Sequence, residues 1–206
     1  FANSVTLSAT YQNVTGGTHD DTVTMIDGAA GNLLLGEGAN VVKVADTLDI
    51  SSATISAVDG TFAVELVGDD TTVTLRAAQL QDAADISETA PGDKTVNVVD
   101  ELTNYTIDAT IDTLVLDDFA NSVTLSATYQ NVTGGTAADT VTMINGATGD
   151  LLLGGGANVV KVANNLDISA ATITATGEGS SFAIDLVGAD TTVTLSAAQL
   201  QDAADI

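Results

Sequence analysis

A long internal repeat limits the folds that this chain can adopt. Residues 1–18 return as residues 119–136 without a single change. The two copies are offset by 118 residues, and by 120 residues after a two-residue insertion near Ser180, so that the second copy runs to Ile206. Long-period repetition is typical of solenoids and arrays, whose units stack to span distance or to present surface. We therefore expect one kind of structural unit that is used more than once.

A finer period of nine residues lies inside the long repeat. Apolar residues recur at nine-residue steps, and most have an apolar partner two positions later. The clearest series is Val96, Tyr105, Leu114, Val123, Val132 and Val141, with Val98, Ile107, Leu116, Leu125, Gly134 and Met143 as partners. An apolar residue at every second position is the pattern of a strand with one buried face. The Thr, Ser, Asn, Asp and Gly residues in between are typical of turns.

These short strands predict an all-β fold, a parallel β-solenoid of the β-roll or β-helix type. Two strands would make a flattened coil of about 18 residues, and successive coils would stack. The alternative is a string of tandem β-sandwich adhesin domains, one per long repeat. Sandwich strands are longer and irregularly spaced, so the fixed step favours the solenoid. The period slips near residues 45 and 85, where we expect loops or coils of unequal size.

The repeat also suggests the domain organisation. Residues 1–118 form repeat unit 1, with a loop near residues 87–94 around the single proline, and residues 119–206 form an incomplete repeat unit 2. We expect one continuous solenoid from a longer protein. The segment AAQLQDAAD, at residues 77–85 and 197–205, would form either one or two helical turns or a bulging loop.

Composition narrows the function classes. The chain has 28 Asp and Glu against 4 Lys and Arg, a net charge of -24. Nucleic acids and anionic lipids need a basic surface, so neither is expected as a partner. A hydrophobic content of 45% is too high for a disordered acidic chain. No apolar stretch is long enough for a membrane-spanning helix, so membrane insertion is not expected. The absence of Cys excludes disulfides, thiolate metal sites and cysteine nucleophiles.

The residues of common active sites are missing, and we expect no enzymatic activity. His19 is the only histidine, and Ala137 stands at its place in the second copy. No Ser-His-Asp triad can therefore occur in both copies. The glycines at 154–156 lack the Lys and Ser or Thr of a phosphate-binding loop. The acidic pair Asp117 and Asp118 lacks the aromatic platforms of most glycosidases.

Four segments carry glycines and acids or amides at the spacing of a known family. Residues 16–24 and 134–142 match the pattern G-G-x-G-x-D-x-U-x, except that His19 and Ala137 replace the third glycine. Residues 36–42 and 154–160 match it with Asn in place of Asp. The chain resembles RTX-type, hemolysin-type nonapeptide repeats, and also bacterial surface-layer and giant adhesin repeats. The resemblance implies a right-handed parallel β-roll, secretion, and Ca²⁺ held in the turns between coils.

The candidate calcium ligands are Asp and Asn residues about one coil apart. They are Asp21, Asn40, Asp139, Asn158, Asn3 and Asn121. Ca²⁺ takes six to eight oxygen ligands, mainly carboxylates and carbonyls, and a glycine-rich turn lets its carbonyls point inward. The alternative is that these side chains cap turns through hydrogen bonds to the local backbone.

The sequence thus predicts an extracellular structural repeat protein that forms a fibre, a surface layer or an adhesin stalk. Its partners would be copies of itself, joined end to end or side by side, at a bacterial cell surface or outside the cell. The alternative is an adhesin module with calcium-stabilised turns that binds a glycan, ice or another surface. Rows of outward Thr residues would suit ice, but such rows do not persist on every coil.

Overall fold

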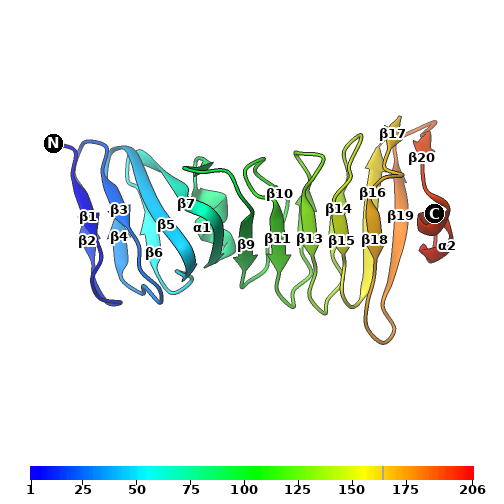
Figure 1. The fold of residues 1–206 in the computed structure, drawn as a ribbon, viewed down its shortest axis with the longest axis horizontal. Helices are drawn as coiled ribbons and strands as arrows, with labels where there is room; N and C mark the ends of the chain where they lie inside the picture. The colour runs from blue at the N-terminus through cyan, green and yellow to red at the C-terminus, as the bar shows by residue number, and fades with distance from the viewer. Residues whose placement is uncertain (164) are drawn as a thin grey trace. The chain divides into compact units, whose positions relative to one another are not determined.

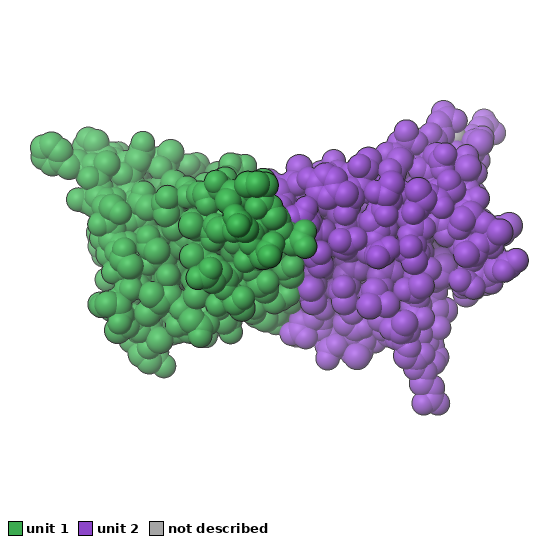
Figure 2. All heavy atoms as spheres, in the orientation of Figure 1, with its two compact units in different colours: residues 1–99 green, residues 100–206 purple. Residues whose placement is uncertain are grey.

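The computed structural model describes residues 1–163 and 165–206 and divides into two compact units, residues 1–99 and residues 100–206 (Figure 2). Each unit is a parallel β-solenoid made mostly of short strands (Figure 1). Every described strand pairing within the units is parallel, whereas a sandwich is built from antiparallel sheets. The predicted fold class is therefore confirmed, and the sandwich alternative is wrong.

Unit 1 builds two parallel sheets, to which the chain contributes strands in alternation. The first sheet has the order β1 (Ser4–Thr6), β3 (Thr22–Thr24), β5 (Gly38–Asp49), β7 (Gly60–Leu75) and β9 (Lys94–Val98), and β8 (Ile86–Glu88) also pairs with β7. The second has the order β2 (Val14–Thr15), β4 (Asn32–Leu34) and β6 (Thr54–Ser56). Each early coil thus supplies one strand to each sheet, as the nine-residue period predicts.

Unit 2 repeats this arrangement. One sheet contains β11 (Thr113–Leu116), β13 (Asn131–Thr133), β15 (Asp150–Leu152) and β18 (Thr172–Thr174). The other contains β10 (Tyr105–Thr106), β12 (Ser122–Thr124), β14 (Thr140–Thr142), β16 (Ala157–Ala163) and β19 (Ser181–Val187). Two further strands, β17 (Leu166–Asp167) and β20 (Val193–Thr194), pair with each other.

The strand register shows how coil length changes along the chain. Val123 lies opposite Val141, and Thr140 opposite Val159, so these coils contain 18 and 19 residues. The next coil contains 24, because Val159 lies opposite Ala183. In unit 1, the pairing of β5 with β7 shifts register between Ala45 and Thr47. The predicted slip near residue 45 is this irregularity, at which Asp46 adopts a positive φ of 53°.

The core consists of aliphatic rows that run through successive coils. Val123, Val132 and Val141 are at most 1% exposed, as expected for the inward positions of the nine-residue ladder. Phe62 and Phe182 are the large rings buried among them. Burial in such a solenoid depends on the neighbouring coils, because one coil alone cannot cover its apolar face.

Two short helices settle the alternative for the AAQLQDAAD segments. They are α1 (Ala77–Asp82), which packs beside β6, and α2 (Ala197–Asp202), which packs beside β18. The helical interpretation is therefore the right one, and the slip near residue 85 follows α1. Residues 89–93 form the connection between β8 and β9. Across the described residues, no helix has the length and apolar character needed to cross a membrane.

Candidate functional site: two asparagine–aspartate columns

The six residues predicted as calcium ligands lie in two columns, one in each unit. Asn3, Asp21 and Asn40 follow one another on successive coils of unit 1. Asn121, Asp139 and Asn158 do the same in unit 2. Coil lengths of 18 and 19 residues bring the members of each column into register, so the spacing of the sequence predicted their proximity.

The column of unit 1 is held by hydrogen bonds between side chains and backbone. Asn3 donates from its backbone N and from Nδ2 to Asp21 Oδ1, at 2.9 and 2.8 Å. Gly17 N donates to Asp21 Oδ2 at 3.0 Å. Asp21 N in turn donates to Asn40 Oδ1 at 2.9 Å. Both carboxylate oxygens of Asp21 therefore already accept N–H donors.

The column of unit 2 is the same arrangement in a more buried setting. Asn121 donates from N and from Nδ2 to Asp139 Oδ1, both at 3.0 Å, and Asp139 N donates to Asn158 Oδ1 at 2.8 Å. Leu102 N donates to Asn121 Oδ1 at 2.9 Å. Asn121, Asp139 and Asn158 are each at most 2% exposed. Such buried polar side chains persist because their partners are fixed by the coil register.

Both columns end on the backbone of the next coil. Asn40 Nδ2 donates to Thr61 O at 3.0 Å, and Asn158 Nδ2 donates to Ser181 O at 3.1 Å. Each Asn also donates to carbonyls of its own turn, such as Gly155 O at 3.0 Å for Asn158. A single amide thus joins three coils. These contacts agree with the alternative in which the Asp and Asn side chains cap turns through hydrogen bonds to the backbone. Here the bonds also join neighbouring coils.

A glycine five residues before each Asp of the columns is required by close packing. A Cβ at Gly16 would lie 2.2 Å from Leu35 O and 2.5 Å from Asp21 Oδ2. A Cβ at Gly134 would lie 2.3 Å from Asp139 Oδ2 and 2.6 Å from Leu153 O. These distances exclude any side chain without movement of the backbone. Gly16 and Gly134, the first glycines of the two segments that match the nonapeptide pattern, therefore have a packing role here.

The two aspartates differ in their electrostatic environment. The Gly17 N–H, followed by the Asn3 side chain, holds the pKa of Asp21 below its usual range. Burial raises the pKa of Asp139, against the hydrogen bonds from Asn121. Asp139 Oδ2 is buried without a hydrogen-bond partner in the described part of the chain, although the nearby Gly135 N–H still lowers the pKa. The repeat thus places one chemical group in two different states.

The columns supply oxygen ligands of the type that Ca²⁺ prefers, but most of these oxygens are engaged. Each column contains one carboxylate, and within the described residues no group of three acidic or histidine side chains converges on one point. Asp139 Oδ2 is the one side-chain oxygen of the unit 2 column that has no donor. Calcium binding at the six residues therefore stays a prediction, and in the unit 2 column it depends on this atom.

A set of buried glutamines was not predicted from the sequence. Gln130 Oε1 accepts from Ser126 N and Ala127 N at 2.7 and 3.0 Å, and its Nε2 donates to Asp108 O and Ile111 O at 2.7 and 3.2 Å. Gln79 and Gln199 make the same kind of link from α1 and α2 to turn carbonyls of another coil. The available signal was that each of these glutamines occurs in both copies.

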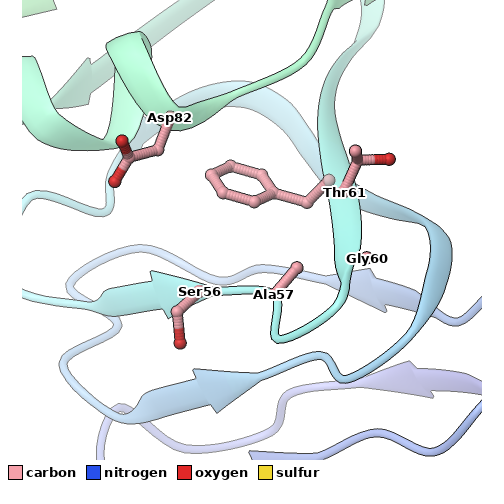
Figure 3. Close-up of a pocket in the computed structure, with 6 residues that line it drawn as sticks. Ser56, Ala57, Gly60, Thr61 and Asp82 are labelled. Carbon is pink, nitrogen blue, oxygen red and sulfur yellow. The ribbon is translucent and has the colours of Figure 1, made fainter.

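Each unit also has a shallow recess between the turn before a long strand and the following helix. In unit 1 it measures about 260 Å³, with Phe62, Thr61, Ser56 and Asp82 in its lining (Figure 3). The counterpart in unit 2 measures about 440 Å³ and is lined by Phe182 and Asp202 among others. The lining combines one carboxylate, hydroxyls and one ring. This is too little chemistry to assign a ligand.

Comparison of the chain with family models, curated proteins and solved structures finds no match.

Proposed function

We propose that this chain is a structural repeat segment of an extracellular or cell-surface protein, and that its role is to span distance in a fibre, surface layer or adhesin stalk. The observation that carries the proposal is the repeated coil stack. In both copies the same polar column and the same aliphatic rows run along the stacking direction of the coils. Repeat proteins of this construction are stabilised mainly by contacts between neighbouring units.

The distribution of charge supports this role. The inward positions hold Val, Leu and Ile, whereas the buried polar residues are mostly amides that are satisfied by backbone groups. Most of the 28 acids are therefore left to the outer surface, which suits a solvated element that must not aggregate. Without this surface charge, exposed edge strands would promote non-specific pairing between molecules.

The proposal is tested by adding copies of residues 1–118 in front of the chain and measuring the maximum dimension by small-angle X-ray scattering. Six or seven coils per copy, at the usual strand spacing of about 4.8 Å, give a step of about 30 Å per added copy. Equal steps over three or more copies are expected for a spanning element. A dimension that stops growing in equal steps would refute the role. Antibody labelling of intact and lysed cells tests the location.

Calcium stabilisation of the turns is the second candidate, and Asp139 Oδ2 is the observation that favours it. The test is thermal unfolding in EDTA and in millimolar Ca²⁺, for the chain and for Asp139→Asn. Ca²⁺ would stabilise the folded form by mass action, so the unfolding temperature should rise with Ca²⁺ and Asp139→Asn should weaken the rise. An unfolding temperature that Ca²⁺ does not move would leave a solenoid that is stable without metal.

A further inference from the structure

We propose that the outer face of the coil formed by residues 1–18 is a docking surface for another coil with the sequence chemistry of residues 100–118. This inference deepens the proposed structural role, because it names the partner through which units of this kind extend. It rests on a comparison that one chain provides. The same 18-residue sequence is present twice, once covered by a neighbouring coil and once bare.

The covered example is in unit 2. Strands β12 and β13 of the coil at residues 119–136 pair in parallel with β10 and β11 of the coil at residues 100–118. Ser122 N donates to Leu102 O at 2.8 Å, and Asn131 N donates to Asp112 O at 2.8 Å. The partner coil donates in return, with Ile107 N bonded to Thr124 O at 2.9 Å. Its backbone therefore satisfies both strands of the coil below it.

Side chains add to this interface. Gln130 Nε2 donates to Asp108 O and Ile111 O, and Tyr129 OH donates to Ala109 O at 2.7 Å. Ser126 Oγ donates to Ile107 O. All three side chains make hydrogen bonds, which a merely hydrophobic surface in place of this coil could not accept. Together they recognise a particular arrangement of backbone carbonyls, which is the arrangement of the coil at residues 100–118.

The bare example is in unit 1. Strands β1 and β2 are edge strands, which pair only with β3 and β4 among the described residues of the unit. Val5 is 37% exposed, whereas its counterpart Val123 is 1% exposed. Tyr11 is 83% exposed, against 50% for Tyr129.

A hollow of about 250 Å³ lies at this end of the core, and its lining combines Val5 and Val14 with polar residues such as Asn3 and Thr15. The counterparts of Val5 and Val14, which are Val123 and Val132, are both buried. An edge strand with exposed apolar side chains beside a hollow is a template for pairing with another chain segment.

Charge supports the choice of partner. Residues 1–18 contain no Asp, Glu, Lys or Arg, which is unusual in a chain with a net charge of -24. The covering coil at residues 100–118 contains six acids and no basic residue. An uncharged receiving coil lets an acidic coil stack on it without the repulsion that two acidic coils would suffer. The uncharged coil at residues 1–18 is therefore suited to an acidic partner coil such as residues 100–118.

The experiment extends the full chain with a second copy of residues 100–118 placed directly before Phe1. This recreates the junction between Asp118 and Phe119. The matched control is the same extension with serine at the positions of Ile107, Leu114 and Leu116. Amide hydrogen exchange of Ser4 and Asn13 is measured by NMR, since their counterparts Ser122 and Asn131 donate to the covering coil. Thr22 N, which donates to Asn3 O, reports that the first coils remain folded.

The extension should slow exchange at Ser4 and Asn13 by at least about tenfold, and the serine control should not. Unchanged exchange with the native extension would overturn the proposal, and so would equal slowing with both extensions. Concentration-dependent protection in the unextended chain, with dimers in sedimentation, would show that a second copy occupies the face and would overturn the assigned occupant. Hydrogen exchange reports on this one interface, whereas scattering reports on the length of the whole molecule. The docking proposal and the spanning role can therefore fail independently.

Discussion

Gln130 provides the sharpest test of how the coils are held together. Gln130→Met keeps the length of the side chain and removes its amide. The change leaves Ser126 N, Ala127 N and Ile111 O without their partner in a region where Gln130 is fully buried. Each unsatisfied buried group costs about 1–3 kcal/mol, so the loss of three partners should lower the free energy of unfolding by at least about 3 kcal/mol. Urea unfolding followed by far-UV circular dichroism measures this loss.

Gln12→Met is the matched control, because Gln12 has the same flanking sequence on the bare coil. Gln12 Oε1 accepts from Ser8 N and Ala9 N at 2.6 and 3.0 Å, but its Nε2 reaches only Ser8 Oγ, at 3.3 Å, among the described residues. Water replaces these partners, so this variant should lose only about 1 kcal/mol. Equal losses in the two variants would refute the reasoning, because they would show that the links between coils contribute nothing.

Four further predictions concern single residues. Because burial raises the folded pKa of Asp139, its ionisation opposes folding as pH rises through that pKa, so Asp139→Asn should gain stability relative to the parent as pH rises from 3 to 7. Asp21→Asn should show the opposite sign in the same titration of urea midpoints, because the lowered pKa stabilises the fold above pH 4 and this stability is lost on acidification. Gly149→Ala should cost more than 3 kcal/mol in the same assay, because its Cβ would lie 2.0 Å from Gln130 O. Lys94→Met should lower the thermal midpoint more than Lys43→Met, because Lys94 Nζ donates to Asp69 O at 2.6 Å from a fully buried position, whereas the Lys43 side chain is 37% exposed.

These predictions have clear contrary outcomes. Parallel pH profiles for the two aspartate variants would show that the columns are electrostatically equivalent. A fully stable Gly149→Ala variant would show that the turn shifts at little cost. Equal midpoints for the two lysine variants would show that the carbonyls around Lys94 are satisfied by water.

The sequence predicted those features that depend on a regular period. Val123, Val132 and Val141 fall in the core because strands bury every second residue, and nine-residue steps bring them to the same layer. The Asn and Asp columns followed from spacings of 18 and 19 residues. The local strand pattern and the stacking of coils have compatible periods, so the fold could be predicted from one sequence.

Features that depend on particular contacts could not be predicted. The burial of Gln130 and Lys94 follows from carbonyls that point inward at turns, and a polar residue type gives no sign of this in advance. The helices α1 and α2 were left open because six residues are too few for a helical period. The different states of Asp21 and Asp139 follow from burial, which identical neighbouring sequence does not reveal.

The two-residue insertion near Ser180 shows where this architecture accepts change. It falls in the turn before β19 and lengthens the coil from the 22 residues between Val41 and Ala63 to the 24 between Val159 and Ala183. The Asn158 amide nevertheless reaches Ser181 O, as the Asn40 amide reaches Thr61 O. The turn before β19 therefore differs in length between the two copies while this link between coils is kept. Loops of foreign sequence that are grafted at this turn should leave the strand pairing intact. In an array of such units, the grafted loops would be exposed at a spacing set by the repeat.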